Sequence, residues 1–335
     1  MQTPRRILLI QLRAIGDVIL TTPALRVLKR HFPDADIDFI TTPAPAEILA
    51  GNPNLHEIIL YPYRANDFAG LLKFCVKLYR NKYDISVDYL GTTATAVMSL
   101  ASRAPRRVGY RLRFRRCFYT HHEQNYRGDV YNALTKFSLL KPLGISEEET
   151  DTEIFVTPEA AEWADQLFDL MGWKDEEVIA LSPAAKRQAR QWLPERFAEV
   201  ARWLMSRGHR IVLTWGPGER DYVAGVARLI GSPDLLFPQT TLMQLAALLQ
   251  RCRLLVCNCG GTKHVAVAVG TPTLTIHGPT DPRVWTPQGD ARHAYVRAEL
   301  DCLDCGKREC EPLKCMAAVS AEQVIQKILE MGVLA

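Results

Sequence analysis

Long apolar runs are missing from this chain of 335 residues. No segment approaches the roughly 20 consecutive apolar residues that a membrane-spanning helix needs, so we expect no such helix. Arg5 and Arg6 precede a short apolar segment, as in a signal peptide, but Arg13 and Asp17 interrupt it and no small-residue cleavage site follows. We therefore expect this segment to form the first strand of a folded domain.

A strong excess of charge is also missing, because the formal net charge is only +4. The hydrophobic fraction of 47% is that of a soluble globular protein, and the length suits two domains of ordinary size. The 9 cysteines are an odd number in a chain without an export signal. This combination favours the reducing cytoplasm over a secreted, disulfide-bonded protein.

Apolar strand-like runs alternate with helical patterns along the whole chain. This alternation is typical of a mostly parallel, doubly wound α/β architecture. The expected strands are 6–10, 36–40, 57–60, 84–88 and 107–109, followed by 178–182, 210–214, 254–257 and 273–276. The expected helices are 18–31, 69–80, 93–102 and 129–141, followed by 195–207, 218–230, 241–250, 262–269 and 320–332.

An acidic stretch, 146–153, indicates the approach to a domain boundary, with a linker near 150–175. We place the boundary after residue 160, which gives two Rossmann-like domains, 1–160 and 161–335. Their ligand loops are expected to face a shared central cleft. No coiled-coil or edge-pairing signal argues against a monomer.

The first expected strand ends in a loop that leads to Gly16 and Asp17. Asp17 lies just past the carboxyl end of the strand, where open α/β sheets keep their ligands. Two roles fit it: a catalytic carboxylate, with Gly16 allowing a substrate to approach, or the N-cap of the next helix. Thr22-Pro23 likewise fits either a second helix start or a kink in one long helix.

Glycine-rich loops follow two strands of the second half. Leu254–Val256 leads into Gly260 and Gly261 before a small-residue helix, and the next strand leads into Gly278-Pro279. Such a junction offers unpaired backbone N–H groups and the positive end of a helix dipole, which favour a bound phosphate. Together the loops indicate a nucleotide diphosphate site, although a tight turn without a ligand fits each loop alone.

Charged residues follow two more strands at the same edge. Lys186, Arg187 and Arg190 are suited to neutralising a diphosphate. Glu219 fits either a hydrogen bond to a ribose or a favourable interaction with its own helix dipole. Four loops at one edge make the nucleotide site a stronger prediction than any single loop does.

Arginines are concentrated between residues 103 and 116 and are interleaved with aromatic residues. Guanidinium groups bind phosphate and carboxylate in a bidentate way, so this cluster favours an acidic partner. An anionic glycolipid or membrane surface and a solvated loop without a partner both remain open. No nucleic-acid-binding motif accompanies the arginines, so we expect no nucleic acid partner. The cluster is Arg103, Arg106, Arg107, Arg111, Arg113, Arg115 and Arg116.

Taken together, these motifs resemble the heptosyltransferases of lipopolysaccharide core assembly, which are GT-B-fold glycosyltransferases that use ADP-heptose. The resemblance extends over nearly the whole chain. The residues that carry it are Gly16-Asp17-Val18, Pro23-Ala24-Leu25, Arg107-Val108-Gly109-Tyr110, Arg190-Gln191-Trp192, Pro194-Glu195, Trp215-Gly216, Gly260-Gly261, His264, Gly270-Thr271-Pro272 and Gly278-Pro279-Thr280-Asp281-Pro282.

The resemblance implies a GT-B fold and an inverting, metal-independent transfer of a heptose, or a related sugar, from ADP-heptose to the inner core of lipopolysaccharide. Asp17 is then the general base, no cofactor is required, and the enzyme is cytoplasmic and peripheral to the inner membrane. The arginine cluster supplies Arg107 and Arg111 as the expected acceptor-binding residues. The implied donor-binding residues are Ala185, Lys186, Arg190, Glu219, Thr240, Cys259, Gly260, Gly261 and His264.

One position departs from the family pattern. The family usually has an Asp followed by Ser or Thr where this chain has Cys259 and Gly260, and that Asp holds sugar hydroxyls of the donor. A thiol is a weaker hydrogen-bond acceptor than a carboxylate. The alternatives are a different donor sugar, a takeover by Asn258, or a catalytically weak paralogue that binds a sugar nucleotide or glycolipid. A GT-B-fold nucleotide-sugar epimerase is the competing enzyme class.

Two patterns raise the question of a metal ion. Asp34–Asp38 contains the Asp-x-Asp spacing of metal-dependent glycosyltransferases, but it lies at the entrance of its strand, so we expect a solvated strand start. Four cysteines near the carboxyl terminus supply soft ligands that suit structural zinc, although free or redox-linked thiols fit as well. They are Cys302, Cys305, Cys310 and Cys315.

Overall fold

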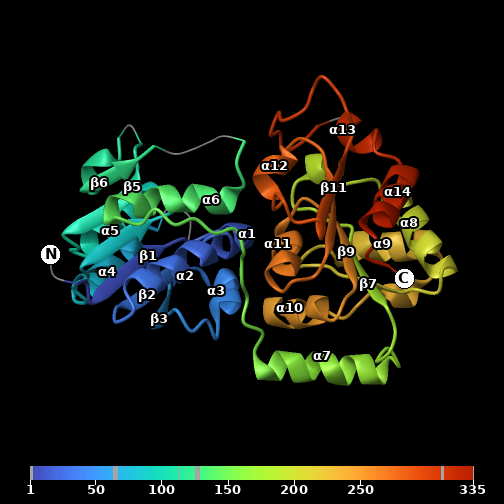
Figure 1. Cartoon of the computed structure of the whole chain (residues 1–335), viewed down its shortest axis with the longest axis horizontal. Coiled ribbons are helices and arrows are strands. Elements are labelled where there is room, and N and C mark those ends of the chain that lie inside the picture. The colour runs from blue at the N-terminus through green and yellow to red at the C-terminus, as the bar shows by residue number, and fades with distance from the viewer. Residues whose placement is uncertain (1–2, 63–66, 113, 125–128, 311–312, 335) are drawn as a thin grey trace. The chain divides into compact units, whose positions relative to one another are not determined.

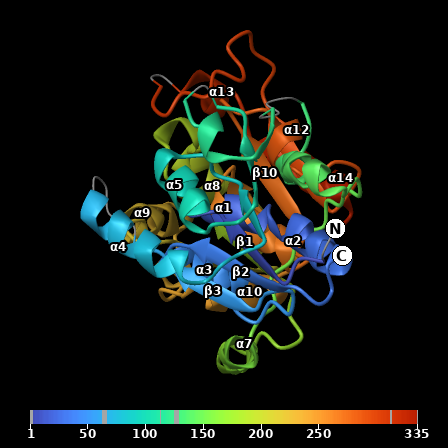
Figure 2. The same ribbon diagram turned by 90° about the vertical axis from the view of Figure 1, so that its left-hand side faces the viewer.

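The computed structural model describes residues 3–62, 67–112, 114–124, 129–310 and 313–334. The chain divides into two compact units, Met1–Phe155 and Val156–Ala335, whereas the sequence places the boundary after residue 160. Each unit is a parallel β-sheet with helices on both faces (Figures 1 and 2). The two doubly wound α/β domains expected from the alternating pattern are therefore confirmed.

The sheet of the first unit has six parallel strands in the order β3-β2-β1-β4-β5-β6. This is the dinucleotide-fold order, in which the strand order reverses between β1 and β4. The strands are β1 (Arg6–Ile10), β2 (Asp36–Thr41), β3 (Glu57–Leu60), β4 (Ile85–Asp88), β5 (Arg106–Tyr110) and β6 (His121–Glu123). The helices are α1 (Ile15–Ile19), α2 (Thr22–His31), α3 (Pro43–Leu49), α4 (Phe68–Tyr79), α5 (Thr93–Ala101) and α6 (Asn132–Phe137), with 3-10 turns η1 (Arg116–Phe118) and η2 (Ser138–Leu143).

Strand β1 is apolar throughout its buried part because it lies in the middle of this sheet. Alternate side chains of a strand point to opposite faces. Leu9 shares a buried cluster with Leu25 of α2, whereas Leu8 shares one with Leu78 of α4 and Met98 of α5. A strand covered by helices on both faces therefore needs a continuous apolar run, which is what the sequence shows.

The sheet of the second unit has five parallel strands in the order β11-β10-β9-β7-β8, and its strand order reverses between β7 and β9. The strands are β7 (Val178–Ser182), β8 (Arg210–Leu213), β9 (Leu254–Asn258), β10 (Thr273–His277) and β11 (His293–Arg297). The helices are α7 (Pro158–Leu170), α8 (Pro194–Ser206), α9 (Arg220–Ile230), α10 (Leu242–Gln250), α11 (Gly261–Ala268), α12 (Pro282–Trp285), α13 (Lys314–Ala317) and α14 (Ala321–Met331), with 3-10 turns η3 (Gln188–Arg190) and η4 (Pro233–Leu235).

Some predicted elements differ from the structure. The predicted linker 150–175 contains helix α7, whose first turn is capped by the Thr157 side chain. The single helix expected over 18–31 is two helices, because Pro23 lies in the first turn of a new one. The pattern also does not predict α3, β6 or β11, which are short or polar.

The acidic stretch that precedes the boundary is held on α2 by ion pairs. Arg26 lies 2.6 Å from carboxylate oxygens of both Glu149 and Glu153. Arg30 lies 2.6 Å from Glu149 and 3.0 Å from Glu147. The chain therefore remains attached to the first unit until shortly before it enters the second.

Helices α7 and α8 have 13 residues each. Within the described residues, no helix combines the length and the apolar character that crossing a membrane requires.

Candidate functional site

Each unit presents candidate residues at the point where its strand order reverses. Such a reversal separates the loops at the carboxyl ends of two adjacent strands and leaves room for a ligand. In the first unit Asp17 follows β1 and Asp88 ends β4. In the second unit Arg190 follows β7, and the segment from Cys259 to His264 follows β9. The topology therefore supports a site in each unit.

Asp17 is partly exposed at the third position of α1. Its Oδ2 accepts a hydrogen bond from Ala14 N at 3.2 Å, which closes the start of the helix. Its Oδ1 lies 3.5 Å from Asn132 Nδ2. Thr135 Oγ1 donates to Asn132 Oδ1 at 2.9 Å, which turns the amide nitrogen of Asn132 toward Asp17. Asp17 thus helps to close the helix start and still presents a carboxylate at the strand end.

A buried lysine lies beside this carboxylate. Lys136 of α6 is only 5% exposed. Burial lowers the pKa of Lys136, while the nearby charge of Asp17 opposes that shift. Burial raises the pKa of Tyr110 at the end of β5, and the charges of Asp88 and Asp17 add to the effect. Sequence reasoning missed both Asn132 and Lys136, because no motif marks α6.

Asp88 fixes the loop that follows β4. Its buried carboxylate accepts hydrogen bonds from Leu90 N at 2.9 Å, Gly91 N at 3.0 Å and the Tyr119 hydroxyl at 2.7 Å. Gly109 makes room for the Tyr119 ring, because a Cβ there would lie 2.5 Å from it. Burial raises the pKa of Asp88, and these donors oppose the rise. We interpret Asp88 as a structural residue at this edge.

In the second unit Asn258 joins the loops after β7 and β9. Its Oδ1 accepts a hydrogen bond from Trp192 N at 2.9 Å, and its Nδ2 donates to Pro183 O at 2.8 Å. The side chain is 2% exposed. This engagement with the backbone argues against the alternative in which Asn258 binds the donor sugar.

Three buried polar atoms at this edge have no partner among the described residues. They are His264 Nδ1, Arg190 Nε and Thr280 Oγ1. His264 is only 5% exposed and Thr280 only 7%. Buried polar groups without partners are costly and rare in folded proteins. Because the three groups come from the segments that follow β7, β9 and β10, they indicate a polar ligand at the carboxyl edge of the sheet.

The second edge combines neutral histidines with a buried lysine. Burial lowers the pKa of His264 and His277 well below the usual range, and the neighbouring Lys263 adds to both shifts. Lys263 is 0% exposed, and its Nζ donates to Trp285 O at 2.5 Å and to Thr286 Oγ1 at 3.4 Å. Both imidazoles are therefore neutral at pH 7, so the positive charge of this edge comes from lysine and arginine.

The other predicted donor-binding residues lie in the same unit. Arg190 Nη1 donates to Cys259 O at 3.4 Å, and Glu219 Oε2 accepts from Gly216 N at 2.8 Å. Gly260 is the N-cap of α11, and a Cβ there would meet no atom closer than a backbone oxygen at 3.9 Å. The start of α11 is therefore open. The remaining predicted residues lie in loops or at this helix start: Ala185, Lys186, Thr240 and Gly261.

The two predicted acceptor-binding arginines lie at different ends of β5. Arg107 Nε donates to Phe118 O at 2.8 Å and its Nη1 to Ala104 O at 2.7 Å, so two nitrogens already bind backbone carbonyls. Arg111 follows the last residue of β5, at the carboxyl edge of the sheet. Acceptor binding by either residue stays a prediction. Arg113 of the same cluster lies outside the described residues.

The four carboxyl-terminal cysteines do not adopt the geometry of a metal site in the described residues. Cys302 and Cys305 are exposed, Cys310 is half-buried and Cys315 is buried. Among the described residues, no three of their sulfur atoms come close enough together to share a metal ion. Cys315 instead packs in the core of the second unit, with its sulfur against Gly278. The structure therefore gives the zinc prediction no support.

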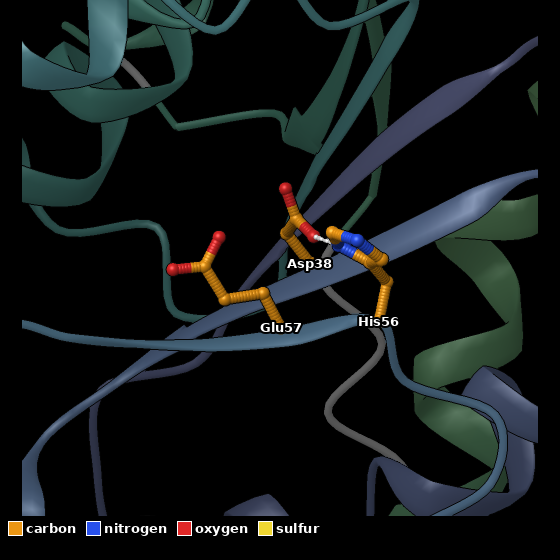
Figure 3. A group of neighbouring side chains, drawn as sticks. All are labelled: Asp38, His56 and Glu57. Atoms are coloured by element: carbon orange, nitrogen blue, oxygen red, sulfur yellow. Dashed lines mark hydrogen bonds and ion pairs between the residues drawn. The ribbon is translucent and has the colours of Figure 1, made fainter.

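The ligand atoms that do lie together belong to Asp38, His56 and Glu57 (Figure 3). Asp38 is 0% exposed, so the expectation of a solvated strand start is wrong for this residue. Its Oδ2 accepts from Arg6 at 2.8 Å and from the Tyr83 hydroxyl at 2.7 Å, and its Oδ1 lies 2.8 Å from His56 Nδ1. Because the guanidinium already balances the carboxylate, we interpret this group as a structural network rather than a metal site.

Comparison with known proteins identifies relatives that match nearly the whole chain. The chain is 26% identical over 317 residues to lipopolysaccharide heptosyltransferase 3 of Escherichia coli, covering 87% of this chain and 90% of that relative. It is 22% identical over 349 residues to the lipopolysaccharide core heptosyltransferase OpsX of Haemophilus influenzae, covering 99% of this chain and 98% of that relative.

Solved structures show the same fold. A glycosyl transferase family 9 protein from Veillonella parvula superposes with a TM-score of 0.86 at 25% identity, covering 99% of this chain and 98% of that one. The E. coli heptosyltransferase WaaC, solved with ADP, superposes with a TM-score of 0.74 at 21% identity, covering 98% of each chain. Residues 71–316 match the family described as glycosyltransferase family 9 (heptosyltransferase). Because that match spans more than half of the sequence, the chain belongs to glycosyltransferase family 9, the heptosyltransferases.

Proposed function

We propose that this protein transfers a heptose from ADP-heptose to the inner core of lipopolysaccharide. Family membership and the names of the relatives support the sugar and the acceptor. The observation that carries the proposal is the set of three unpartnered buried groups, on Arg190, His264 and Thr280, around the open start of α11. A diphosphate with its attached sugar supplies the acceptor and donor atoms that such a set lacks.

In this proposal Asp17 is the general base. An acceptor hydroxyl attacks the anomeric carbon of the donor, the bond from that carbon to the diphosphate oxygen breaks, and Asp17 takes the hydroxyl proton. Attack from the face opposite the leaving group inverts the configuration. Between reaction cycles, Asn132 orients the carboxylate of Asp17 through a hydrogen bond, and the positive charge of Lys136 offsets its negative charge. ADP leaves as an anion.

The second unit stabilises that leaving group. Arg190 and the amide N–H groups at the start of α11 would offset the charge that develops on the diphosphate. Lys186, in the exposed part of the loop after β7, adds a further cation. These groups provide the charge compensation that a metal ion provides in other transferases, so the proposal includes no metal.

The proposed acceptor is an anionic glycolipid, so the proposal also includes where the enzyme works. Arg111, at the carboxyl edge of the first sheet, is the residue of the arginine cluster best placed to meet acidic groups of the acceptor. The enzyme would then work as a monomer at the cytoplasmic face of the inner membrane. A catalytically weak paralogue is the second candidate, because Cys259 stands where the family has a carboxylate.

The first test is calorimetric titration of the purified protein with ADP, UDP, GDP and ADP-heptose in the absence of metal. We expect ADP and ADP-heptose to bind and the other nucleotides to bind more weakly. Binding of ADP-heptose without turnover on a core acceptor would select the weak paralogue. Consumption of the donor without any acceptor would select an epimerase.

The second test is Asp17→Asn. Loss of a general base typically lowers the rate by about 10²–10⁴-fold, so we expect kcat to fall by that factor while ADP binding is unchanged. The matched control is Asp88→Asn, which alters a carboxylate of the same edge that we assign to structure, and which should change thermal stability more than it changes catalysis. Full activity of Asp17→Asn would remove Asp17 as the base.

A further inference from the structure

Helix α4 of the first unit is attached to its sheet through one face. Cys75 and Leu78 of this helix belong to the buried cluster between the sheet, α4 and α5, and Leu71 and Phe74 pack against that cluster. The helix begins at Asp67, whose side chain accepts a hydrogen bond from Gly70 N at 2.7 Å. These contacts fix which face of α4 points away from the sheet.

The opposite face of α4 is apolar as well. Phe68 is 79% exposed, Leu72 is 67%, Val76 is 54% and Tyr79 is 53%. Residues three or four apart lie on the same side of a helix, so these four form one continuous stripe. Single exposed apolar residues are ordinary, but an aligned row of large ones indicates a surface that binds something.

Positive charge surrounds the stripe. Lys73, Lys77, Arg80 and Lys82 are exposed on or just after α4, and no acidic residue occurs between residues 68 and 82. The guanidinium of Arg103, from the arginine cluster, lies 4.6 Å from the centre of the Tyr79 ring. This contact adds a positive charge from the end of α5 to the surface.

The nearest acidic side chains in sequence are already engaged by backbone N–H groups. The side chain of Asp67 caps α4, and Asp84 Oδ2 accepts from Arg5 N at 2.7 Å and from Arg6 N at 2.9 Å. The apolar stripe therefore has a basic border with little opposing charge. Large apolar side chains bordered by lysine and arginine are the arrangement of helices that lie in the interface of an anionic bilayer.

We propose that the exposed face of α4 docks the first unit on an anionic lipid membrane. Phe68, Leu72 and Val76 enter the boundary between headgroups and acyl chains, while Lys73 and Lys77 contact lipid phosphates. The proposal deepens the proposed function, because a lipid-linked acceptor must be reached at a membrane surface. It assigns this contact to α4 rather than to the arginines near β5.

The test is co-sedimentation of the full chain with vesicles of phosphatidylcholine alone or of phosphatidylcholine mixed with phosphatidylglycerol. We expect the wild type to bind the anionic vesicles at least tenfold better, and less well at high salt. Phe68→Ser combined with Leu72→Ser should lower the bound fraction on anionic vesicles at least tenfold. Lys73→Glu combined with Lys77→Glu should remove the preference for anionic lipid.

A matched control is Leu170→Ser, which removes a side chain that is 83% exposed on α7 of the second unit. It should leave vesicle binding unchanged. Equal binding by the Phe68/Leu72 variant and the wild type, or no binding by the wild type, would overturn the proposal. So would light scattering that shows a wild-type dimer which the variant converts to a monomer, because the face would then bind a second copy.

The same variants separate this proposal from the proposed function. With a deacylated, water-soluble acceptor, the Phe68/Leu72 variant should transfer sugar at the wild-type rate, since α4 is remote in sequence and role from Asp17. Absence of transfer by the wild type would contradict the proposed function. The vesicle experiment would still test membrane docking, because it measures binding and not transfer.

Discussion

The two units share a parallel α/β architecture but carry side chains of opposite charge at the carboxyl edges of their sheets. The first edge holds two carboxylates, Asp17 and Asp88. The second holds cations, Arg190 and Lys263, with His264 kept neutral by burial. In each case the residues lie where the strand order reverses, although the orders themselves differ.

This contrast teaches that the fold fixes where a ligand can bind, while the loop residues fix which chemistry is done there. An acidic edge can receive a proton, and a cationic edge can stabilise a departing anion. This division of roles predicts that substitutions at the acidic edge change catalysis without changing nucleotide affinity. Substitutions at the cationic edge should change nucleotide affinity.

Arg190→Ala should have the largest effect on the second edge. A hydrogen bond to a charged group contributes about 1.5–3 kcal/mol, so ADP affinity should fall roughly 10- to 150-fold. Calorimetry with ADP measures this directly. Asp17→Asn serves as the comparison, since it should leave ADP affinity within twofold. An unchanged dissociation constant for Arg190→Ala would break the assignment of opposite roles to the two edges.

Cys259→Asp should weaken the contrast by placing a carboxylate on the cationic edge. Cys259 is 3% exposed and lies next to Arg190 and Lys263, which can balance the new charge. If the donor sugar is a heptose, the carboxylate should bind its hydroxyls, and affinity for ADP-heptose relative to ADP should rise about tenfold. Cys259→Ser is the uncharged control. An equal ratio in both variants would indicate a different donor sugar.

Asn132→Ala and Lys136→Met test the support around Asp17. The amide lies at a long 3.5 Å, so its loss should lower kcat roughly two- to tenfold with little change in ADP affinity. Lys136→Met should also lower kcat, because it removes the positive charge beside Asp17. An unchanged kcat would mark Lys136 as a structural residue only.

The pH dependence of these variants follows from the lysine. Burial lowers its pKa, so Lys136 is charged at low pH and becomes neutral as the pH rises through a value below 10.5. The wild-type rate should therefore decline on the alkaline side before pH 10.5, and Lys136→Met should show a lower rate without that decline. A pH-rate profile of kcat for both proteins checks this.

The strands and the two edges could be predicted from the sequence because their signals are local. An apolar run followed by glycine and a helical pattern identified β1, β8, β9 and β10 and placed Asp17 at a carboxyl edge. β6 and β11 were missed because they lie at sheet edges and contain polar residues such as His121 and Arg297. A strand with one neighbour needs no continuous apolar pattern.

Support for the candidate sites is not local and could not be predicted. Asn132 reaches Asp17 across 115 residues of sequence, and no motif accompanies it. The burial of Asp38 was missed for the same reason, because its partners Arg6 and Tyr83 come from other elements. The start of α7 was different: Thr157-Pro158 is a helix start signal that the sequence contains and that was interpreted as a linker.

His56→Gln should have the smallest effect, and it concerns the end of the first sheet that carries no proposed chemistry. The hydrogen bond to Asp38 raises the pKa of His56, so the folded state favours the protonated ring. The resulting stabilisation is fully present below the unfolded value of about 6.5 and is lost as the pH rises through the higher folded value. The His56 side chain is 50% exposed, which keeps the contribution small.

Melting curves at pH 5.5 should place the His56→Gln variant about 1 °C below the wild type, and curves at pH 8.5 should coincide. A difference that grows with pH would mean that Asp38 binds the neutral ring instead. Transfer activity should be the same in both proteins, because only the two carboxyl edges are assigned to catalysis.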